Sequence, residues 1–341
     1  MVRFVFREGQ EKGIIRSPAI IEYNDDYTKI IRWGTPVLQQ LKNDPDNPNE
    51  DSEFPREICT FQVFNSEQED NWLPPELSRK KLISDYLSEI QKVIVSTIQE
   101  NWTGVKPSQE TGVVFIVPDK WGPTYCNILS QCLLENRLLC DNKENIQFIS
   151  RGKAIALNCL SENKGVLKYG DYFLIVEIDR DTINLTAREY MSENTLDEIH
   201  DRKGDFKENS NSILPSLKEL ILSLKNENLK TNLELNKWCV ELDLKLIADL
   251  FDPLSDRLQR FINTKFKDED EYIEYSVIFF VGNIFKSDYL VQKIKKLEFS
   301  KNVKICIVPN SENLILLNGA LEFVQDNTLY PVLTSLLRRA F

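Results

Sequence analysis

Three consecutive residues at the start of a predicted helix have the chemistry to bind an anion. Arg151, Gly152 and Lys153 come directly before the apolar helical pattern AIALNCL. The first backbone N–H groups of a helix have no partner within the helix, and the helix dipole makes that end partly positive. A glycine between two cations at this point would therefore suit an anion. The alternative that stays open is an ordinary helix start in contact with water.

A second group of charged residues lies in a predicted β-hairpin between residues 168 and 190. A Gly-Asp turn precedes an apolar run from Tyr172 to Val176, and apolar residues then alternate with polar ones from Ile183 to Arg188. This pattern predicts a buried strand, a tight turn and a half-buried partner strand. The predicted turn is Asp179-Arg180-Asp181, so three charged side chains gather where the chain reverses.

The seven cysteines do not form a metal-binding pattern. Cys126, Cys132 and Cys140 have no spacing that puts three ligands on one face, and the only histidine, His200, is far away in the sequence. No C-x-x-C pair occurs. We therefore expect reduced thiols, most of them in the core, and no metal site built on them.

Length and charge limit the class of protein. The 341 residues, 42% of them hydrophobic, suffice for two lobes of about 150 residues each. The 53 acidic and 42 basic residues give a net charge of -11, and a phosphate-backbone footprint needs clustered cations, so we expect no general nucleic-acid partner. The sequence shows neither a secretory signal nor an apolar run of about 18 residues, which predicts a cytoplasmic protein that makes no use of a membrane.

Apolar patterns predict strands and helices that alternate along the chain, which is typical of an α/β fold. Pro74 and Pro75 would open the first long helix, because proline fits a first helical turn. Further strands are predicted over 2–6, 17–23, 28–34, 111–118, 275–282 and 303–309 and within 238–246, and helices over 74–99, 214–224 and 246–266 and from about 123, 153 and 310.

Several stretches, in the same order along the chain, resemble the 70-kDa heat-shock chaperones of the actin-like ATPase superfamily. The stretch from Phe173 to Thr186 resembles F-L-I-V-D-x-G-G-G-T-x-D-L-T. The stretch 148–160, FISRGKAIALNCL, resembles F-I-T-E-P-E-A-A-A-I-Y-C-L, and the stretch 281–290 resembles V-G-G-F-S-x-S-x-Y-L. The resemblance covers nearly the whole chain and is strongest to the divergent eukaryotic branch that lacks the usual peptide-clamp domain.

This resemblance implies a two-lobed actin-like ATPase fold, of the ribonuclease H-like kind. The first lobe, residues 1–165, would lack its N-terminal phosphate hairpin, D-x-G-T-T-x-S, because the chain begins after that motif or has lost it. The second lobe, residues 166–341, would have a reduced helical subdomain and would end in a hinge helix.

The resemblance also implies a site for ATP or ADP with Mg²⁺ between the phosphate hairpins. Asn283 replaces the second glycine of the adenosine loop, and asparagine is the substitute best able to keep a left-handed backbone angle. The candidate nucleotide contacts are Thr182, Gly204, Gly282, Asn283 and Ser287.

Other positions of that site depart from the family pattern. Gln62 replaces the lysine near the γ-phosphate, Arg151 replaces a glutamate at the cleft, and Glu177 replaces an aspartate. The Asp179-Arg180-Asp181 turn replaces three glycines, whose backbone lets N–H groups approach phosphate oxygens. Losing one such donor costs about 3 to 4 kcal/mol in kcat, and each close carboxylate repels a phosphate by about 1 kcal/mol or more.

Three hypotheses follow from these departures. The first is a binding or regulatory pseudo-ATPase with weak or no ATP binding, whose partners are chaperones or client proteins. The second is an ATP-binding chaperone-type ATPase with a remodelled site, in which Glu177 and Asp179 hold Mg²⁺ and Arg180 or Arg151 contacts phosphate. The third is a truncated product without a role.

Overall fold

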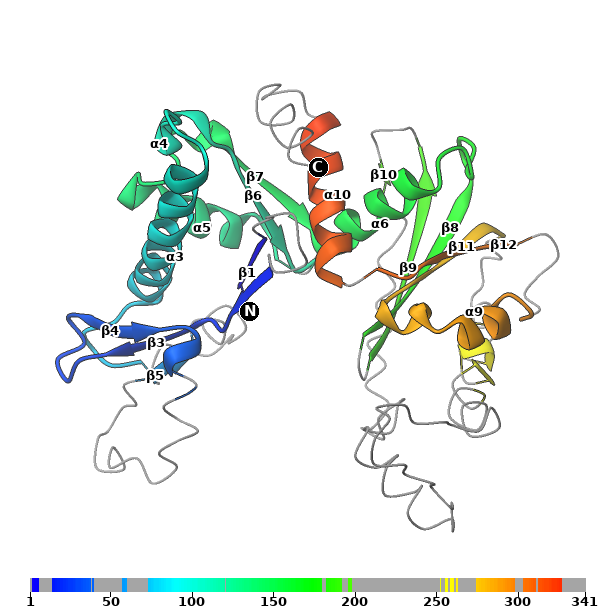
Figure 1. The fold of residues 1–341 in the computed structure, drawn as a ribbon, viewed down its shortest axis with the longest axis horizontal. Coiled ribbons are helices and arrows are strands. Elements are labelled where there is room, and N and C mark those ends of the chain that lie inside the picture. The colour runs from blue at the N-terminus through cyan, green and yellow to red at the C-terminus, as the bar shows by residue number, and fades with distance from the viewer. Residues whose placement is uncertain are drawn as a thin grey trace, which may run out of the picture. The chain divides into compact units, whose positions relative to one another are not determined.

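The computed structural model describes residues 2–5, 14–37, 39, 57–59, 73–119, 121–179, 182–191, 196–197, 252, 255–256, 258–260, 262, 274–297, 303–310 and 312–326. Contacts divide the chain into two compact units. Unit 1 comprises Met1–Ala154 and Phe323–Phe341, and unit 2 comprises Ile155–Glu322. Helices and strands occur in both units, so the architecture is mixed α/β, as the sequence predicts (Figure 1).

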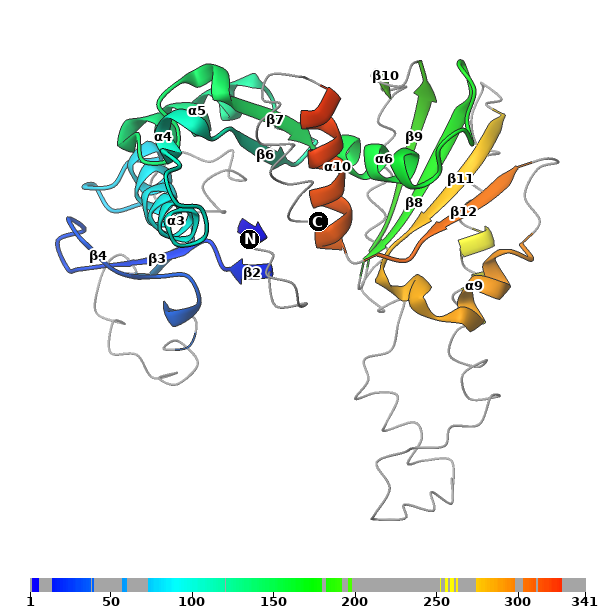
Figure 2. The same ribbon diagram turned by 45° about the horizontal axis from the view of Figure 1, so that its top comes forward.

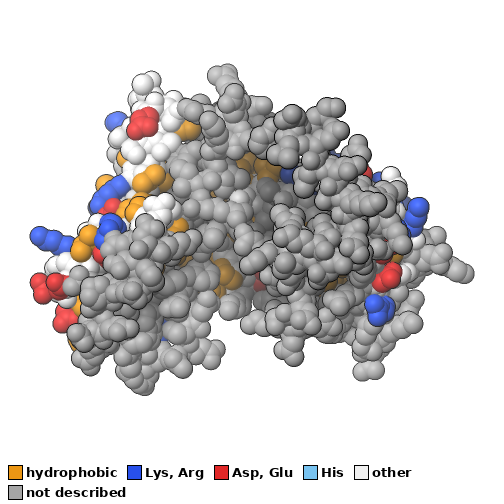
Figure 3. Space-filling view, turned by 60° about the horizontal axis from the view of Figure 1, so that its bottom comes forward, with side chains coloured by type: hydrophobic (Ala, Val, Ile, Leu, Met, Phe, Trp, Pro, Cys, Tyr) orange, Lys and Arg blue, Asp and Glu red, His pale blue; other side chains and the backbone are white. Residues whose placement is uncertain are grey.

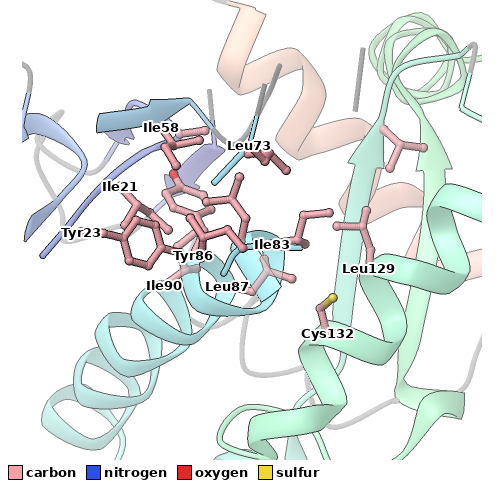
Figure 4. Close-up of a cluster of buried hydrophobic side chains, with 14 residues drawn as sticks. Ile21, Tyr23, Ile58, Leu73, Ile83, Tyr86, Leu87, Ile90, Leu129 and Cys132 are labelled. Atoms are coloured by element: carbon pink, nitrogen blue, oxygen red, sulfur yellow. The ribbon is translucent and has the colours of Figure 1, made fainter. Parts of the chain in front are cut away.

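The main core of unit 1 lies between a long helix and a three-stranded antiparallel sheet. The sheet has the order β4 (Ile30–Trp33), β3 (Ile20–Tyr23), β5 (Glu57–Cys59), and the helix is α3 (Arg79–Asn101). The strands predicted over 17–23 and 28–34 are thus confirmed, and they pair as an antiparallel hairpin. Figure 4 shows side chains of α3 that point toward β3, β5 and helix α5. The labelled members of this cluster are Ile21, Tyr23, Ile58, Leu73, Ile83, Tyr86, Leu87, Ile90, Leu129 and Cys132.

Helix α3 begins later than the prolines predict. Its first residue is Arg79, because the side chain of Ser78 accepts a hydrogen bond from the backbone N–H of Lys81 at 3.1 Å and caps the helix. Pro74 lies in a turn before the helix, in which its carbonyl accepts the N–H of Leu77. The prediction that the prolines form the first helical turn is therefore wrong.

Two smaller sheets belong to unit 1. β1 (Val2–Val5) pairs antiparallel with β2 (Ile14–Ser17), and β6 (Val113–Val117) pairs parallel with β7 (Ile146–Ser150). The strands predicted at 2–6 and 111–118 are present, but β6 is only partly buried. The helical elements next to β6 and β7 in unit 1 are α4 (Pro107–Glu110), α5 (Pro123–Asn136) and the 3-10 helix η2 (Lys143–Asn145). Helix α6 (Arg151–Glu162) follows β7 in the chain and continues into unit 2.

Unit 2 is built on a five-stranded sheet in the order β10-β9-β8-β11-β12. β8 (Tyr172–Asp179), β9 (Thr182–Tyr190) and β10 (Leu196–Asp197) form an antiparallel meander. β11 (Tyr275–Val281) and β12 (Lys304–Val308) run parallel to β8. The predicted hairpin and both later strands are confirmed, although Asp179 ends strand β8 instead of opening the turn.

Helices cover the sheet of unit 2. The 3-10 helix η3 (Asn283–Lys286) and α9 (Asp288–Ile294) follow β11, and α10 (Glu312–Asp326) follows β12. Phe285 and Leu290 pack with alternate residues of β8 and β11 on one face of the sheet. Figure 2 shows α6 and α9 on opposite sides of this sheet.

The described cysteines are mostly core thiols, as predicted. Cys132, Cys140, Cys159 and Cys306 are buried, whereas Cys126 is only half-buried. Burial raises the pKa of the Cys132 thiol to about 11. These thiols therefore remain neutral near neutral pH.

Several predicted elements lie outside the described residues, namely those at 214–224 and within 238–246. In the predicted helix over 246–266, the described positions 252, 255–256, 258–260 and 262 are helical. Across the part of the chain that the structure describes, no helix combines the length and the apolar character that crossing a bilayer requires.

We expect the replacement Leu82→Ala to lower the free energy of unfolding by about 2 to 5 kcal/mol, because the side chain of Leu82, on the core face of α3, is fully buried. Urea unfolding followed by circular dichroism measures the change. The control is Gln99→Ala on the same helix, where the side chain is exposed and the change should stay within about 0.5 kcal/mol. Equal effects of the two replacements would contradict the assigned core face.

Candidate functional site

The predicted site positions of unit 2 meet at one edge of its sheet. Because β8 and β11 are parallel, their carboxyl ends lie at the same edge, which is where open α/β sheets bind ligands. Glu177 on β8 pairs with Val281 on β11. Gly282, the residue after Val281, therefore lies next to the end of β8. At the hairpin end, Asp179 pairs with Thr182. The structure thus brings together four of the positions that the sequence singled out.

Glu177 is a buried carboxylate at this edge. Its residue is 5% exposed, and its Oε2 accepts a hydrogen bond from Asn184 Nδ2 on β9 at 3.4 Å. Cys159 of α6 lies near enough that Glu177 contributes to its raised pKa, after burial and after Glu162. The sheet face that carries Glu177 is therefore covered by α6.

Gly282 has a structural reason to be glycine. Its φ is +143°, and a Cβ at this position would lie 2.3 Å from the carbonyl oxygen of Ile178 on β8. Its own N–H donates to the carbonyl of Val308 on β12 at 3.3 Å. The glycine therefore lets the end of β11 lie directly against the backbone of β8, and its N–H group is already used within the sheet.

The loop after Gly282 differs from the expected adenosine loop. Asn283 is exposed and starts the 3-10 helix η3 with no left-handed backbone angle, so the prediction that it preserves such an angle is wrong. A 3-10 turn uses ordinary right-handed angles and needs no glycine substitute. The Oγ of Ser287 accepts from the N–H of Leu290 at 3.5 Å and caps α9.

A polar cluster that the sequence did not predict joins α9 to residue 252. Tyr289 Oη donates to Asp252 Oδ1 at 2.8 Å, and Lys293 Nζ lies 3.0 Å from the same oxygen. The hydrogen bond from Tyr289, followed by that from Lys293, lowers the pKa of Asp252. Because 37 positions separate Asp252 from Tyr289, no local spacing in the sequence indicates this contact. These contacts hold α9 against residue 252, and the polar atoms of the three side chains interact with one another.

The start of α6 is capped by side chains of the protein itself. Asp119 Oδ1 accepts the backbone N–H of Gly152 at 3.0 Å, and Ser150 Oγ accepts that of Lys153 at 3.2 Å. The Nζ of Lys153 lies 5.4 Å from the ring centroid of Phe323, so this cation faces an aromatic ring. Of the two readings of the sequence, an anion site and a solvated helix start, neither describes this capped end. Arg151, the first residue of α6, belongs to unit 1.

Some predicted site residues cannot be placed. Gln62, Arg180 and Gly204 lie outside the described residues, as do the side chains of Asp179 and Thr182. Within the described part of the chain, no group of three or more His, Cys, Asp or Glu residues is arranged to hold a metal ion.

No protein-family model matches the chain, and no curated protein matches it. The heat-shock resemblance therefore stays a prediction from the residues.

We expect Gly282→Ala to lower the free energy of unfolding by more than about 3 kcal/mol, because the added Cβ meets the Ile178 carbonyl in addition to the backbone strain. Chemical denaturation measures the loss. Gly165→Ala in the same unit is the control, since Gly165 has φ +73° but open space around it, and should cost about 1 to 2 kcal/mol. A Gly282→Ala variant as stable as the control would show that the close approach is absent.

We expect Asp119→Ala to cost about 1 kcal/mol of stability, because the Gly152 N–H at the start of α6 loses its acceptor. Asp119→Asn keeps an amide oxygen in the same place and should retain most of that stability. Thermal unfolding of both variants makes the comparison, and an equal loss in the two would argue for a role of the charge instead of the cap.

Proposed function

We propose that the chain is a 70-kDa heat-shock-like protein with a degenerate actin-like ATPase fold, and that it works as a binding or regulatory protein with weak or no ATP binding. The order of the unit 2 sheet supports the fold part of this proposal. A three-stranded meander continues, on the side of its first strand, into two parallel strands, which is how a ribonuclease H-like lobe is built. The two compact units are also compatible with two lobes.

The functional proposal rests on one observation: at the positions that match the family, the polar atoms make hydrogen bonds within the fold. The N–H of Gly282 is bonded to β12, and the hydroxyl of Ser287 caps α9. Tyr289, the next matching residue of that loop, donates to Asp252. Each of these residues has a role in the fold, so each would be kept in a protein that no longer binds nucleotide.

The acidic residues of β8 also support the proposal of weak or no ATP binding. Glu177 is buried at the carboxyl edge of the sheet, and Asp179 follows two residues later on the same strand. Each carboxylate close to a phosphate costs about 1 kcal/mol even in a water-like dielectric. Catalysis of phosphoryl transfer requires groups that stabilise negative charge, and an acidic residue such as Glu177 is not one of them.

A second candidate function is an ATP-binding chaperone-type ATPase with a remodelled site. One observation favours it: Glu177 and Asp179 both lie at the carboxyl edge of the sheet, where ligands of α/β proteins bind. Carboxylate oxygens are ligands that Mg²⁺ accepts. In that case the two residues would hold Mg-ATP or Mg-ADP, and Arg180 or Arg151 would contact the phosphates.

The partners that fit the proposal are proteins, namely chaperones or client proteins in the cytoplasm. Figure 3 shows lysine, arginine, aspartate and glutamate side chains near one another on the described part of one face. Mixed charges of this kind suit a protein partner better than a phosphate backbone, which calls for a basic stripe.

We expect no rise in melting temperature when the chain is mixed with Mg²⁺ and either ATP or ADP. Ligand at a hundred times its Kd would stabilise the folded state by about 2.7 kcal/mol, so a shift would be easy to see. The decisive control is Glu177→Ala. A nucleotide-dependent shift that this variant abolishes would support the remodelled ATPase and would overturn the pseudo-ATPase proposal.

A further inference from the structure

We draw no further inference here: the strongest candidate, the buried side-chain amides of Asn158 on α6 and Asn313 on α10, which include atoms without a hydrogen-bond partner among the described residues, carries nothing because nothing in the described part of the chain shows what group these amides would bind.

Discussion

The burial of β8 between β9 and β11 is the interaction on which unit 2 depends. Phe173 and Val176 on this strand are fully buried, and each such side chain contributes about 1.5 to 3 kcal/mol relative to exposure. Gly282 completes the arrangement, because only a residue without a Cβ lets the end of β11 lie against the carbonyl of Ile178. These contacts fix the carboxyl edge of the sheet whatever side chains the hairpin turn carries.

On the proposed heat-shock-like fold, packing explains why the resemblance is uneven along the chain. Apolar strand residues and Gly282 are held by packing, so a change there destabilises the fold. Glu177, which departs from the family pattern, is held by the fold as well, since it is buried and accepts a hydrogen bond from Asn184. A chain of this kind can lose a phosphate-binding surface and keep its sheet. At the capped start of α6, the Asp119 side chain accepts the N–H of Gly152, so a group of the protein itself uses that backbone donor.

The sequence predicts correctly the elements whose pattern lies within a few neighbouring residues. The continuous apolar run of β11 and the alternation in β9 predicted both strands, because side-chain periodicity follows directly from backbone geometry. The start of α3 was missed, since proline suits both a turn and a first helical position, and the Ser78 cap decided between them. The partial exposure of β6 was missed as well, because an all-apolar run does not show how much of a strand the fold covers.

A single sequence does not indicate contacts between positions that are far apart in the chain. Asp119 lies 33 positions before Gly152, and Asp252 lies 37 before Tyr289, so the fold alone brings them together. The central proposal is that the sheet edge around Glu177 binds nucleotide weakly or not at all. Isothermal titration of the chain with Mg-ATP tests this most directly: the account predicts no binding heat, and a micromolar Kd would contradict it.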